Sequence, residues 1–262
     1  NRYEGVLTGK GLSFGGLAGR NEATGFGIVF FAREMLKHFG EELKGKKVAL
    51  SGFGNVTWGT ARKLNELGAK VITISGPDGY ILDEDGVSGE KVDYLVELRA
   101  SGKNICAPYA EKFPGAKFFP GKKPWEVKAD LYIPCATQNE IHLEDAKVMV
   151  ANGCKYLCEG SNMPTTNEAI KYLMDNGVIV GPSKAANAGG VACSCIEMGQ
   201  NAGHTVFSPE QVYEQLETII VNIHKNSAEA SERYGLGYNL VAGANIAGFE
   251  KVAQAMMAQG VV

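Results

Sequence analysis

The chain has 262 residues, a formal net charge of −3 and no run of Lys or Arg. This length can form one large α/β domain or two small ones, with a substantial buried core. The nearly balanced charge excludes a basic nucleic-acid surface, and no apolar stretch is as long as a transmembrane helix. We therefore expect a cytoplasmic protein that has neither nucleic acid nor membrane as a partner.

The start of the chain and its six cysteines indicate the setting in which it acts. Asn1 stands where an initiator Met would be, and no signal-peptide pattern follows, which indicates a processed protein or part of a longer one. Buried free thiols in a reducing compartment are the expected state of the cysteines. Two spacings, Cys154-x3-Cys158 and Cys193-x-Cys195, would suit half of a metal site, but no histidine stands beside them. We expect no metal.

The first two thirds of the chain alternate between predicted strands and predicted helices. The expected helices cover residues 21–38, 56–67, 90–101, 143–151 and 165–175, the last one starting with a Thr165/Glu168 capping box. The expected strands cover residues 48–50, 69–75, 117–119, 131–134, 156–158 and 178–180. Residues 79–86 are predicted as a polar turn on the rim of the sheet.

The last third of the chain is predicted to be helical. Ser208, Pro209 and Gln211 combine an N-cap serine, a first-turn proline and a capping-box glutamine. The helix that they begin ends at Gly235, and a final helix covers residues 240–257. Alternation of strands and helices predicts an α/β fold with a doubly wound, mostly parallel Rossmann-like sheet. We expect one domain over residues 1–262, with the first and last helices packed outside it.

A glycine pair follows the strand over residues 48–50, and a helix begins directly after it. This order predicts a dinucleotide site, because Gly52 permits a tight turn and Gly54 admits backbone N–H groups to a pyrophosphate at the positive end of the helix. The third position of the motif, usually Gly or Ala, is Thr57 here. We expect Gly54 to tolerate no side chain, either because it meets the pyrophosphate or because the turn needs a positive φ there.

An acidic residue follows the second strand of this unit. Asp78 stands where a carboxylate can bind the ribose hydroxyls of NAD, and no Lys or Arg between Val71 and Glu90 would neutralise the extra phosphate of NADP. The position therefore predicts a preference for NAD. The alternative is a solvated turn aspartate after Pro77.

Four predicted strand ends carry polar, glycine-rich loops. Each loop alone is an ordinary turn, but in an open parallel sheet such ends meet at one edge, where ligands bind. We therefore expect them to line one elongated cofactor cleft. The loops are Gly52–Asn55, Cys135–Asn139, Gly160–Thr166 and Lys184–Gly190.

Several segments together resemble glutamate dehydrogenase, in its small hexameric, NAD-dependent bacterial form. They are Thr8–Lys10, Ser13–Gly16, Arg20–Gly25, Gly52–Val56, Asn162–Thr166, Asn187–Val191 and Leu240–Phe249. The resemblance extends over the whole chain but covers only the second, cofactor-binding domain of that family, so the first domain would precede Asn1. It implies hydride transfer from Cα of L-glutamate to NAD, which yields 2-oxoglutarate and ammonia.

The resemblance also implies roles for individual residues. Thr24 and Asn162 would contact the nicotinamide carboxamide, and Asn55 the pyrophosphate or a ribose. Ser194 and Asn187 would contribute to the substrate site, with Val191 beside the amino-acid side chain. The full set of expected cofactor-binding residues is Thr24, Gly52, Phe53, Gly54, Asn55, Val56, Asp78, Ala136, Thr137, Asn162 and Asn187.

No catalytic residue is expected in this chain, because the lysine and aspartate that transfer protons in that family belong to its first domain. The chain alone should therefore bind NAD(H) without turnover, and glutamate only together with the first domain. Two alternatives stay open: the cofactor domain of a leucine, valine or phenylalanine dehydrogenase, and a nucleotide-binding module without catalysis. The hydroxyl group of Ser194 disfavours the former, because a site for an aliphatic side chain would leave it unpaired.

Overall fold

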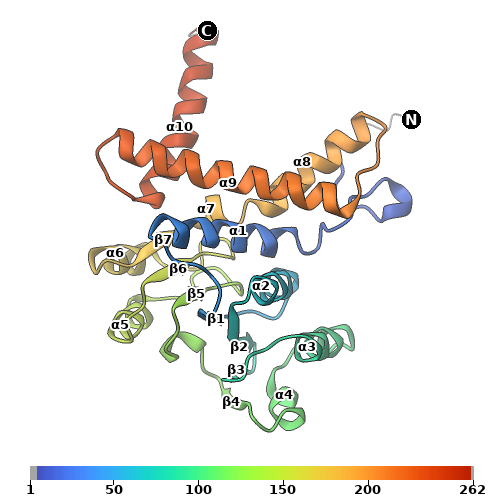
Figure 1. Cartoon of the computed structure of the whole chain (residues 1–262), viewed down its shortest axis with the longest axis vertical. Coiled ribbons are helices and arrows are strands. Elements are labelled where there is room, and N and C mark those ends of the chain that lie inside the picture. The colour runs from blue at the N-terminus through green and yellow to red at the C-terminus, as the bar shows by residue number, and fades with distance from the viewer. Residues whose placement is uncertain (1–4, 261–262) are drawn as a thin grey trace.

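The computed structural model describes residues 5–260 and contains a seven-stranded sheet with helices on both faces (Figure 1). The strand order is β4-β3-β2-β1-β5-β6-β7. Five strands are parallel to one another: β1 (Lys47–Leu50), β2 (Lys70–Gly76), β5 (Leu131–Ile133), β6 (Tyr156–Cys158) and β7 (Ile179–Gly181). An antiparallel edge is formed by β3 (Gly79–Leu82) and β4 (Lys117–Pro120). The expected doubly wound, mostly parallel α/β sheet is confirmed.

Two layers of helices cover the sheet. One layer contains α1 (Ala23–His38), α2 (Asn55–Glu66) and α3 (Glu90–Ala100); the other contains η2 (Pro124–Glu126), α5 (Leu143–Ala151) and α6 (Asn167–Asp175). Strand side chains alternate between the two layers: Val48 and Leu50 belong to the first core, and Ala49 belongs to the second. Both faces are buried, so these strands appear in the sequence as continuous apolar runs.

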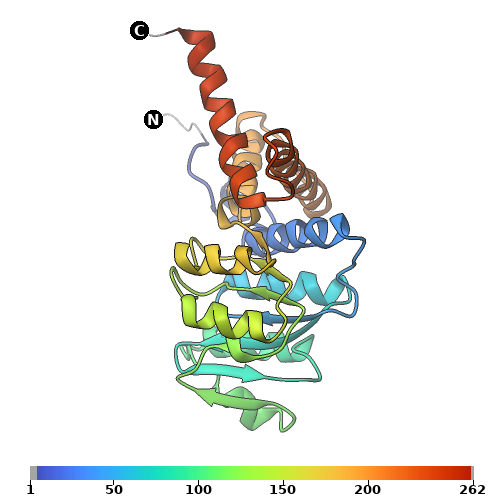
Figure 2. The same ribbon diagram turned by 90° about the vertical axis from the view of Figure 1, so that its left-hand side faces the viewer.

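The last third of the chain is helical, as expected. Its helices are α7 (Ser183–Ala186), α8 (Gly189–Ala202), α9 (Pro209–Arg233) and α10 (Leu240–Gln259). Helix α7 and the start of α8 replace most of the loop that was predicted over residues 184–190. The capping box at the start of α9 is confirmed, because the Ser208 N–H donates to Gln211 Oε1 at 2.9 Å and Gln211 N–H donates to Ser208 Oγ at 3.3 Å. Helix α10 contacts α9 and then projects away from the sheet (Figures 1 and 2). Helix α1 is more central than expected, because it lies between the sheet and α9.

Two local expectations are wrong, the turn over residues 79–86 and the Thr165 cap, and one helix was not expected. Residues 79–82 form strand β3 instead of a turn, and a short helix that was not expected, α4 (Ala107–Lys112), follows α3. The cap of α6 is Thr166, whose Oγ1 accepts a hydrogen bond from Ala169 N at 3.3 Å. Thr165 is instead buried and pairs with Ile141 in an isolated parallel bridge. Strand β3 was missed because its four residues lie within a polar stretch. So short an apolar run cannot be distinguished from a turn by its pattern.

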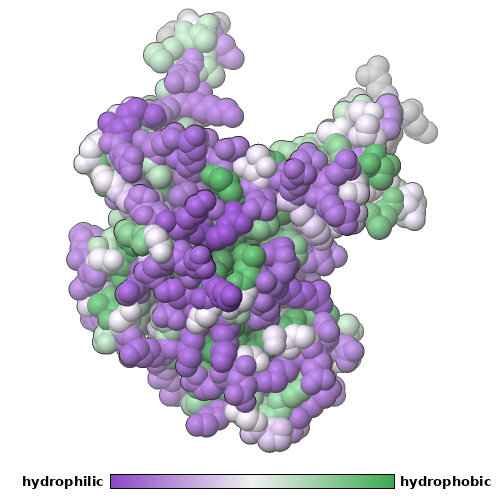
Figure 3. Space-filling view, in the orientation of Figure 1, coloured by the Kyte–Doolittle hydropathy of each residue, from purple (hydrophilic) through white to green (hydrophobic). Residues whose placement is uncertain are grey.

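The surface and the cysteines add three observations. Within residues 5–260, none of the helices combines the length and apolarity that a membrane crossing requires. The six cysteines are free thiols, of which Cys195 is exposed and the others are buried, and the described residues contain no cluster of His, Cys, Asp or Glu suited to a metal ion. The face seen in Figure 3 is mainly hydrophilic, with hydrophobic side chains in small separate patches.

Candidate functional site

The two glycines of the turn between β1 and α2 have different constraints. Gly52 has φ of +95°, and a Cβ there would lie 2.5 Å from Thr57 Oγ1 and 2.7 Å from the Cys135 carbonyl oxygen. Gly54 is extended, with φ of −146°, and a Cβ there would meet no atom within 4 Å. The expectation of a positive φ at Gly54 is therefore wrong: the turn constrains Gly52, and Gly54 borders open space.

Helix α2 begins without a side-chain cap for its first N–H groups among residues 5–260. Its N-cap, Gly54, has no side chain, and its first turn contains no acidic residue. Helix N-terminal N–H groups carry partial positive charge and bind anions. The third motif position is filled by Thr57, which is fully buried and donates its hydroxyl hydrogen to Ser51 O at 3.2 Å. The threonine thus packs α2 onto β1 and leaves the end of the helix open to an anion.

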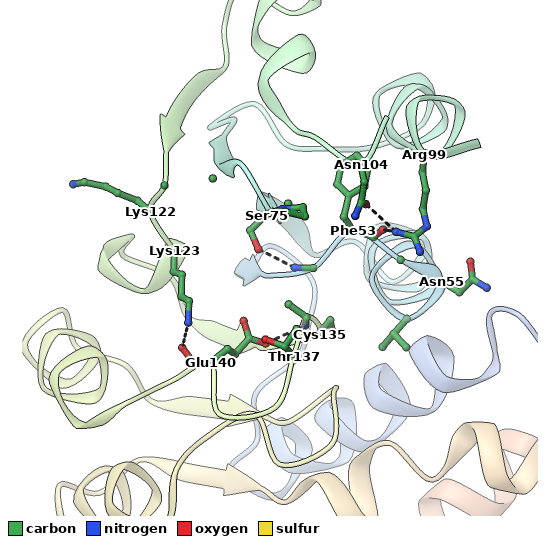
Figure 4. Close-up of a pocket in the computed structure, with 18 residues that line it drawn as sticks. Phe53, Asn55, Ser75, Arg99, Asn104, Lys122, Lys123, Cys135, Thr137 and Glu140 are labelled. Atoms are coloured by element: carbon green, nitrogen blue, oxygen red, sulfur yellow. Dashed lines mark hydrogen bonds between the residues drawn. The ribbon is translucent and has the colours of Figure 1, made fainter. Parts of the chain in front are cut away.

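A cavity of about 780 Å³ lies over this turn (Figure 4), and we call it the first cavity. It contains the expected residues Gly52–Val56, Ala136 and Thr137. Cys135 belongs to the expected strand-end loop Cys135–Asn139. The remaining lining residues were not expected, and they come from the end of β2, the start of β3, helix α3 and the loops after β2, α3, β4 and β5. They are Ser75, Gly76, Pro77, Gly79, Arg99, Asn104, Gly121, Lys122, Lys123 and Glu140.

Positive side chains stand on opposite sides of the first cavity (Figure 4). On one side, the Arg99 guanidinium donates to Asn104 Oδ1 at 2.9 Å and also contacts Phe53 O. On the other side, Lys123 Nζ donates to the backbone oxygen of Glu140 at 2.7 Å. These groups give the cavity a positive rim that would favour an anionic ligand.

A second cavity of about 490 Å³ adjoins the first. The two share the lining residues Val56 and Cys135–Thr137, so they form one elongated cleft along the carboxyl ends of the parallel strands. This continuity is the arrangement expected from the four strand-end loops. The remaining lining residues of the second cavity are Arg20, Thr24, Gln138, Gly160, Ser161, Asn162, Asn187, Gly190 and Val191.

The second cavity contains amide groups and a cation. Asn187 Nδ2 donates to Asn162 Oδ1 at 2.8 Å, so two expected residues meet across the loops after β6 and β7. Arg20 Nε is buried and has no hydrogen-bond partner within the described part of the chain. A buried hydrogen-bond donor without a partner destabilises a folded protein, unless a ligand or a water molecule accepts its hydrogen. In the sequence, Arg20 is recognisable only as part of the segment Arg20–Gly25, and the residue pattern indicates no role for it.

Ser194 lines neither cavity. Its Oγ donates to Gly190 O at 3.1 Å and accepts from Thr8 Oγ1 at 3.1 Å, so the N-terminal segment meets α8 here. One turn further, the fully buried Glu197 accepts from Gly9 N at 2.9 Å and from Lys10 Nζ at 2.6 Å. The segment Thr8–Lys10 is thereby fixed on α8. The segment Thr8–Lys10 is part of the resemblance seen in the sequence, but nothing in the residue pattern indicated that it contacts α8.

Asp78 also lines neither cavity. Its carboxylate accepts hydrogen bonds from Cys106 N, at 2.8 and 2.9 Å, and from Ala107 N at 2.9 Å. It therefore caps the start of α4, while Gly76 and Pro77 form the cavity wall at the end of β2. The contact of Asp78 with a ribose stays a prediction.

The fold and the cleft define a Rossmann-type nucleotide-binding domain. The chain matches the Glutamate/Leucine/Phenylalanine/Valine dehydrogenase family over residues 15–260 and belongs to that family. It is 57% identical to the NAD-specific glutamate dehydrogenase of Clostridium symbiosum and 55% identical to that of Bacteroides fragilis, covering 99% of this chain and 58% of each relative.

A solved structure of a glutamate dehydrogenase aligns with a TM-score of 0.96 at 56% identity. That alignment covers 99% of this chain and 58% of the other one, so the chain spans little more than half the length of the proteins that it matches. The resemblance inferred from the sequence is thereby confirmed, and it concerns the cofactor-binding domain.

Proposed function

We propose that this chain is the NAD(H)-binding domain of a glutamate dehydrogenase, which converts L-glutamate and NAD to 2-oxoglutarate, ammonia and NADH. The observation that carries this proposal is the continuous cleft with the uncapped start of α2 beside it. The cleft has room for a ligand with two halves, and the helix end offers an anion site between them. The NAD-specific relatives support NAD as the ligand.

The residues of the cleft fit this cofactor. The pyrophosphate would lie at Gly54 and Asn55, where the helix N–H groups are free and no side chain intrudes. The adenosine half would occupy the first cavity, between Pro77 and Arg99. The nicotinamide half would occupy the second cavity, with its carboxamide near Thr24 and Asn162. When bound, the cofactor accepts the hydride, and the chain positions it.

The substrate would lie beside the second cavity. Arg20 offers an unpaired guanidinium N–H to a carboxylate, and Val191 is exposed at the rim, where it would contact the substrate side chain. Ser194 and Thr8 present a pair of hydroxyl groups at the adjacent end of α8. However, the hydroxyl of Ser194 is already paired inside the chain, so it does not by itself disfavour an aliphatic substrate. The choice of glutamate rests on the relatives.

Catalysis requires more than this chain provides. Hydride transfer needs glutamate held against the nicotinamide, with an acid–base group to move its amine proton. We assign those tasks to the part of the relatives that the chain does not span, and we assign the hexamer of the family to the complete protein. The free thiols fit a cytoplasmic location, where reducing agents keep them intact.

The test is a titration of the chain with NADH, followed by an assay of glutamate oxidation. A ligand at 100 times its Kd stabilises a fold by about 2.7 kcal/mol, which raises Tm by roughly 5–10 °C for a domain of this size. We expect that shift and no turnover. Absence of any shift with NADH would contradict the assigned cleft. Turnover by the purified chain would show that it contains catalytic groups.

A further inference from the structure

Glu140 is the one carboxyl side chain among the described residues that line the first cavity. It lies in the loop after β5 and is only 3% exposed. Figure 4 shows it on the wall of the cavity, between Lys123 and Thr137. A buried carboxyl beside the site of an anionic ligand needs an explanation, because a charged carboxylate would repel that ligand.

The hydrogen bonds determine which oxygen of Glu140 can carry a proton. Ser51 Oγ accepts from Cys135 N at 2.9 Å, so its own hydrogen is free to be donated to Glu140 Oε1 at 3.0 Å. Ala136 N also donates to Oε1, at 3.0 Å. Oε1 therefore accepts two hydrogen bonds, so we place the proton of this carboxyl on Oε2, the oxygen that accepts from neither Ser51 nor Ala136. The Oε2–H group is then a hydrogen-bond donor on a side chain that lines the first cavity.

The surroundings of Glu140 keep a proton available near neutral pH. Burial raises its pKa to about 7, against the opposing effects of the hydrogen bonds from Ser51, Ala136 and Thr137 and of the charge on Lys123. The Cys135 thiol stays neutral, because burial raises its pKa strongly. Arg99 and Lys122 face the same cavity, and Lys122 is paired with Glu126 at 2.9 Å.

We propose that Glu140 is a further ligand-binding residue of the cleft, whose protonated carboxyl donates a hydrogen bond from Oε2 to an oxygen of the bound dinucleotide. This inference rests on the proposed function, since it needs an anionic dinucleotide in the first cavity. It implies that binding takes up a proton from solvent whenever the free chain holds a carboxylate at this position.

The pH dependence follows from this uptake. If only the protonated form binds, affinity is constant well below pH 7 and falls about tenfold per pH unit well above it. Between pH 6.5 and 8.5 the Kd for NADH should therefore rise about 25-fold. At pH 7.0 about half a proton should be taken up for each NADH bound.

The experiment compares the chain with Glu140→Gln and with Glu159→Gln. A glutamine at position 140 can accept from Ser51 and Ala136 and still donate into the cavity, so this variant imitates the protonated acid at every pH. Glu159 is the matched control: it is a buried carboxyl with a raised pKa that accepts from Ser183 N at 2.8 Å and lines neither cavity. NADH affinity is measured by fluorescence from pH 6.5 to 8.5.

We expect Glu140→Gln to bind NADH at pH 8.5 as tightly as the unmodified chain does at pH 6.5, with no pH dependence. Glu159→Gln should keep the full pH dependence. Unchanged pH dependence in Glu140→Gln would overturn the inference and leave NADH binding intact. If Glu140→Gln does not fold, calorimetry of NADH binding to the unmodified chain in two buffers of different ionisation enthalpy measures the proton uptake directly. Absence of proton uptake would overturn the inference. Failure to bind NADH at any pH would overturn the proposed function as well.

Discussion

The backbone N–H of Cys106 donates a bifurcated hydrogen bond to both carboxylate oxygens of Asp78, at 2.8 and 2.9 Å. This contact joins the end of β2 to the start of α4, in the manner of an N-cap. Caps of this kind contribute about 1 kcal/mol to stability. A substitution at Asp78 therefore changes the local fold and the charge near Pro77 together, and the two effects have to be separated.

Asp78→Asn separates them. The amide oxygen can still accept from Cys106 N, so Tm should stay within a few degrees of the unmodified chain, while the negative charge is lost. We expect the preference for NAD over NADP to narrow by up to roughly tenfold, because a like-charge term near the surface is worth about 1 kcal/mol. Titration with both cofactors measures this ratio. Equal binding of NAD and NADP by the unmodified chain would remove Asp78 as a discriminator.

Gly54→Ala and Gly52→Ala form a matched pair. The methyl group at position 54 enters open space in an extended backbone, so Tm should be unchanged, while NADH affinity falls because the methyl group occupies the expected position of the pyrophosphate. At position 52 the methyl group meets Thr57 and Cys135 at a φ of +95°, so the free energy of unfolding should fall by about 1–3 kcal/mol. Normal NADH binding by Gly54→Ala would place the phosphates elsewhere.

Ser194→Val tests the hydroxyl pair on α8, in a protein that joins this domain to its catalytic partner domain. The variant removes the acceptor for Thr8 and, with it, a polar contact to the substrate. A hydrogen bond to a charged group is worth about 1.5–3 kcal/mol, so kcat/KM for glutamate should fall roughly 10- to 150-fold. Cys195→Val, the exposed neighbour, is the control. Unchanged kinetics of Ser194→Val on glutamate would exclude this hydroxyl from the substrate site.

His224 predicts a loss of stability in mild acid. Burial lowers its pKa from 6.5 to about 4, while its Nε2 lies 2.7 Å from Tyr238 Oη. The unfolded chain therefore binds the proton first, so stability is complete above pH 6.5 and falls by about 3 kcal/mol as pH decreases to 4. His224→Gln should flatten this dependence.

Glu140 changes stability in the opposite direction in part of this pH range. Its pKa in the folded chain is raised to about 7, so its contribution to stability decreases as pH rises. The effect of His224 is therefore read as the difference in Tm between the unmodified chain and His224→Gln from pH 4.5 to 7. Parallel curves for the two proteins would contradict the assignment to His224.

The parts of the fold that were predictable have local signals. The Ser208 capping box and the buried run before Gly52 each lie within a few adjacent residues. Strand β3 and helix α4 were missed because their evidence is not local: Tyr80 becomes a strand residue by pairing with Phe119, and α4 begins where Asp78 caps it. Such pairings depend on the order of strands in the sheet, which the local pattern does not specify.

The same distinction holds for the site. The glycine turn was predictable, since strand, turn and helix adjoin in the chain. Arg99 and Lys123 come from an exposed helix and a loop, where lysines and arginines are usual, and only the strand order brings them to one cavity. The position of the Glu140 proton on Oε2 likewise depends on the hydrogen bond that Oε1 accepts from Ser51, which lies 89 positions earlier.

The two cavities share the wall formed by Val56 and Cys135–Thr137, so the pyrophosphate of a dinucleotide bound as proposed would be a tether between the sites of its two halves. Each half of the dinucleotide, taken alone, would bind with low affinity, because it fills one cavity only. Once one half is bound, the other is held at an effective concentration set by the short linker, in the millimolar range or above. AMP and nicotinamide mononucleotide together should therefore fail to reproduce the affinity of the intact cofactor, although they would touch the same residues.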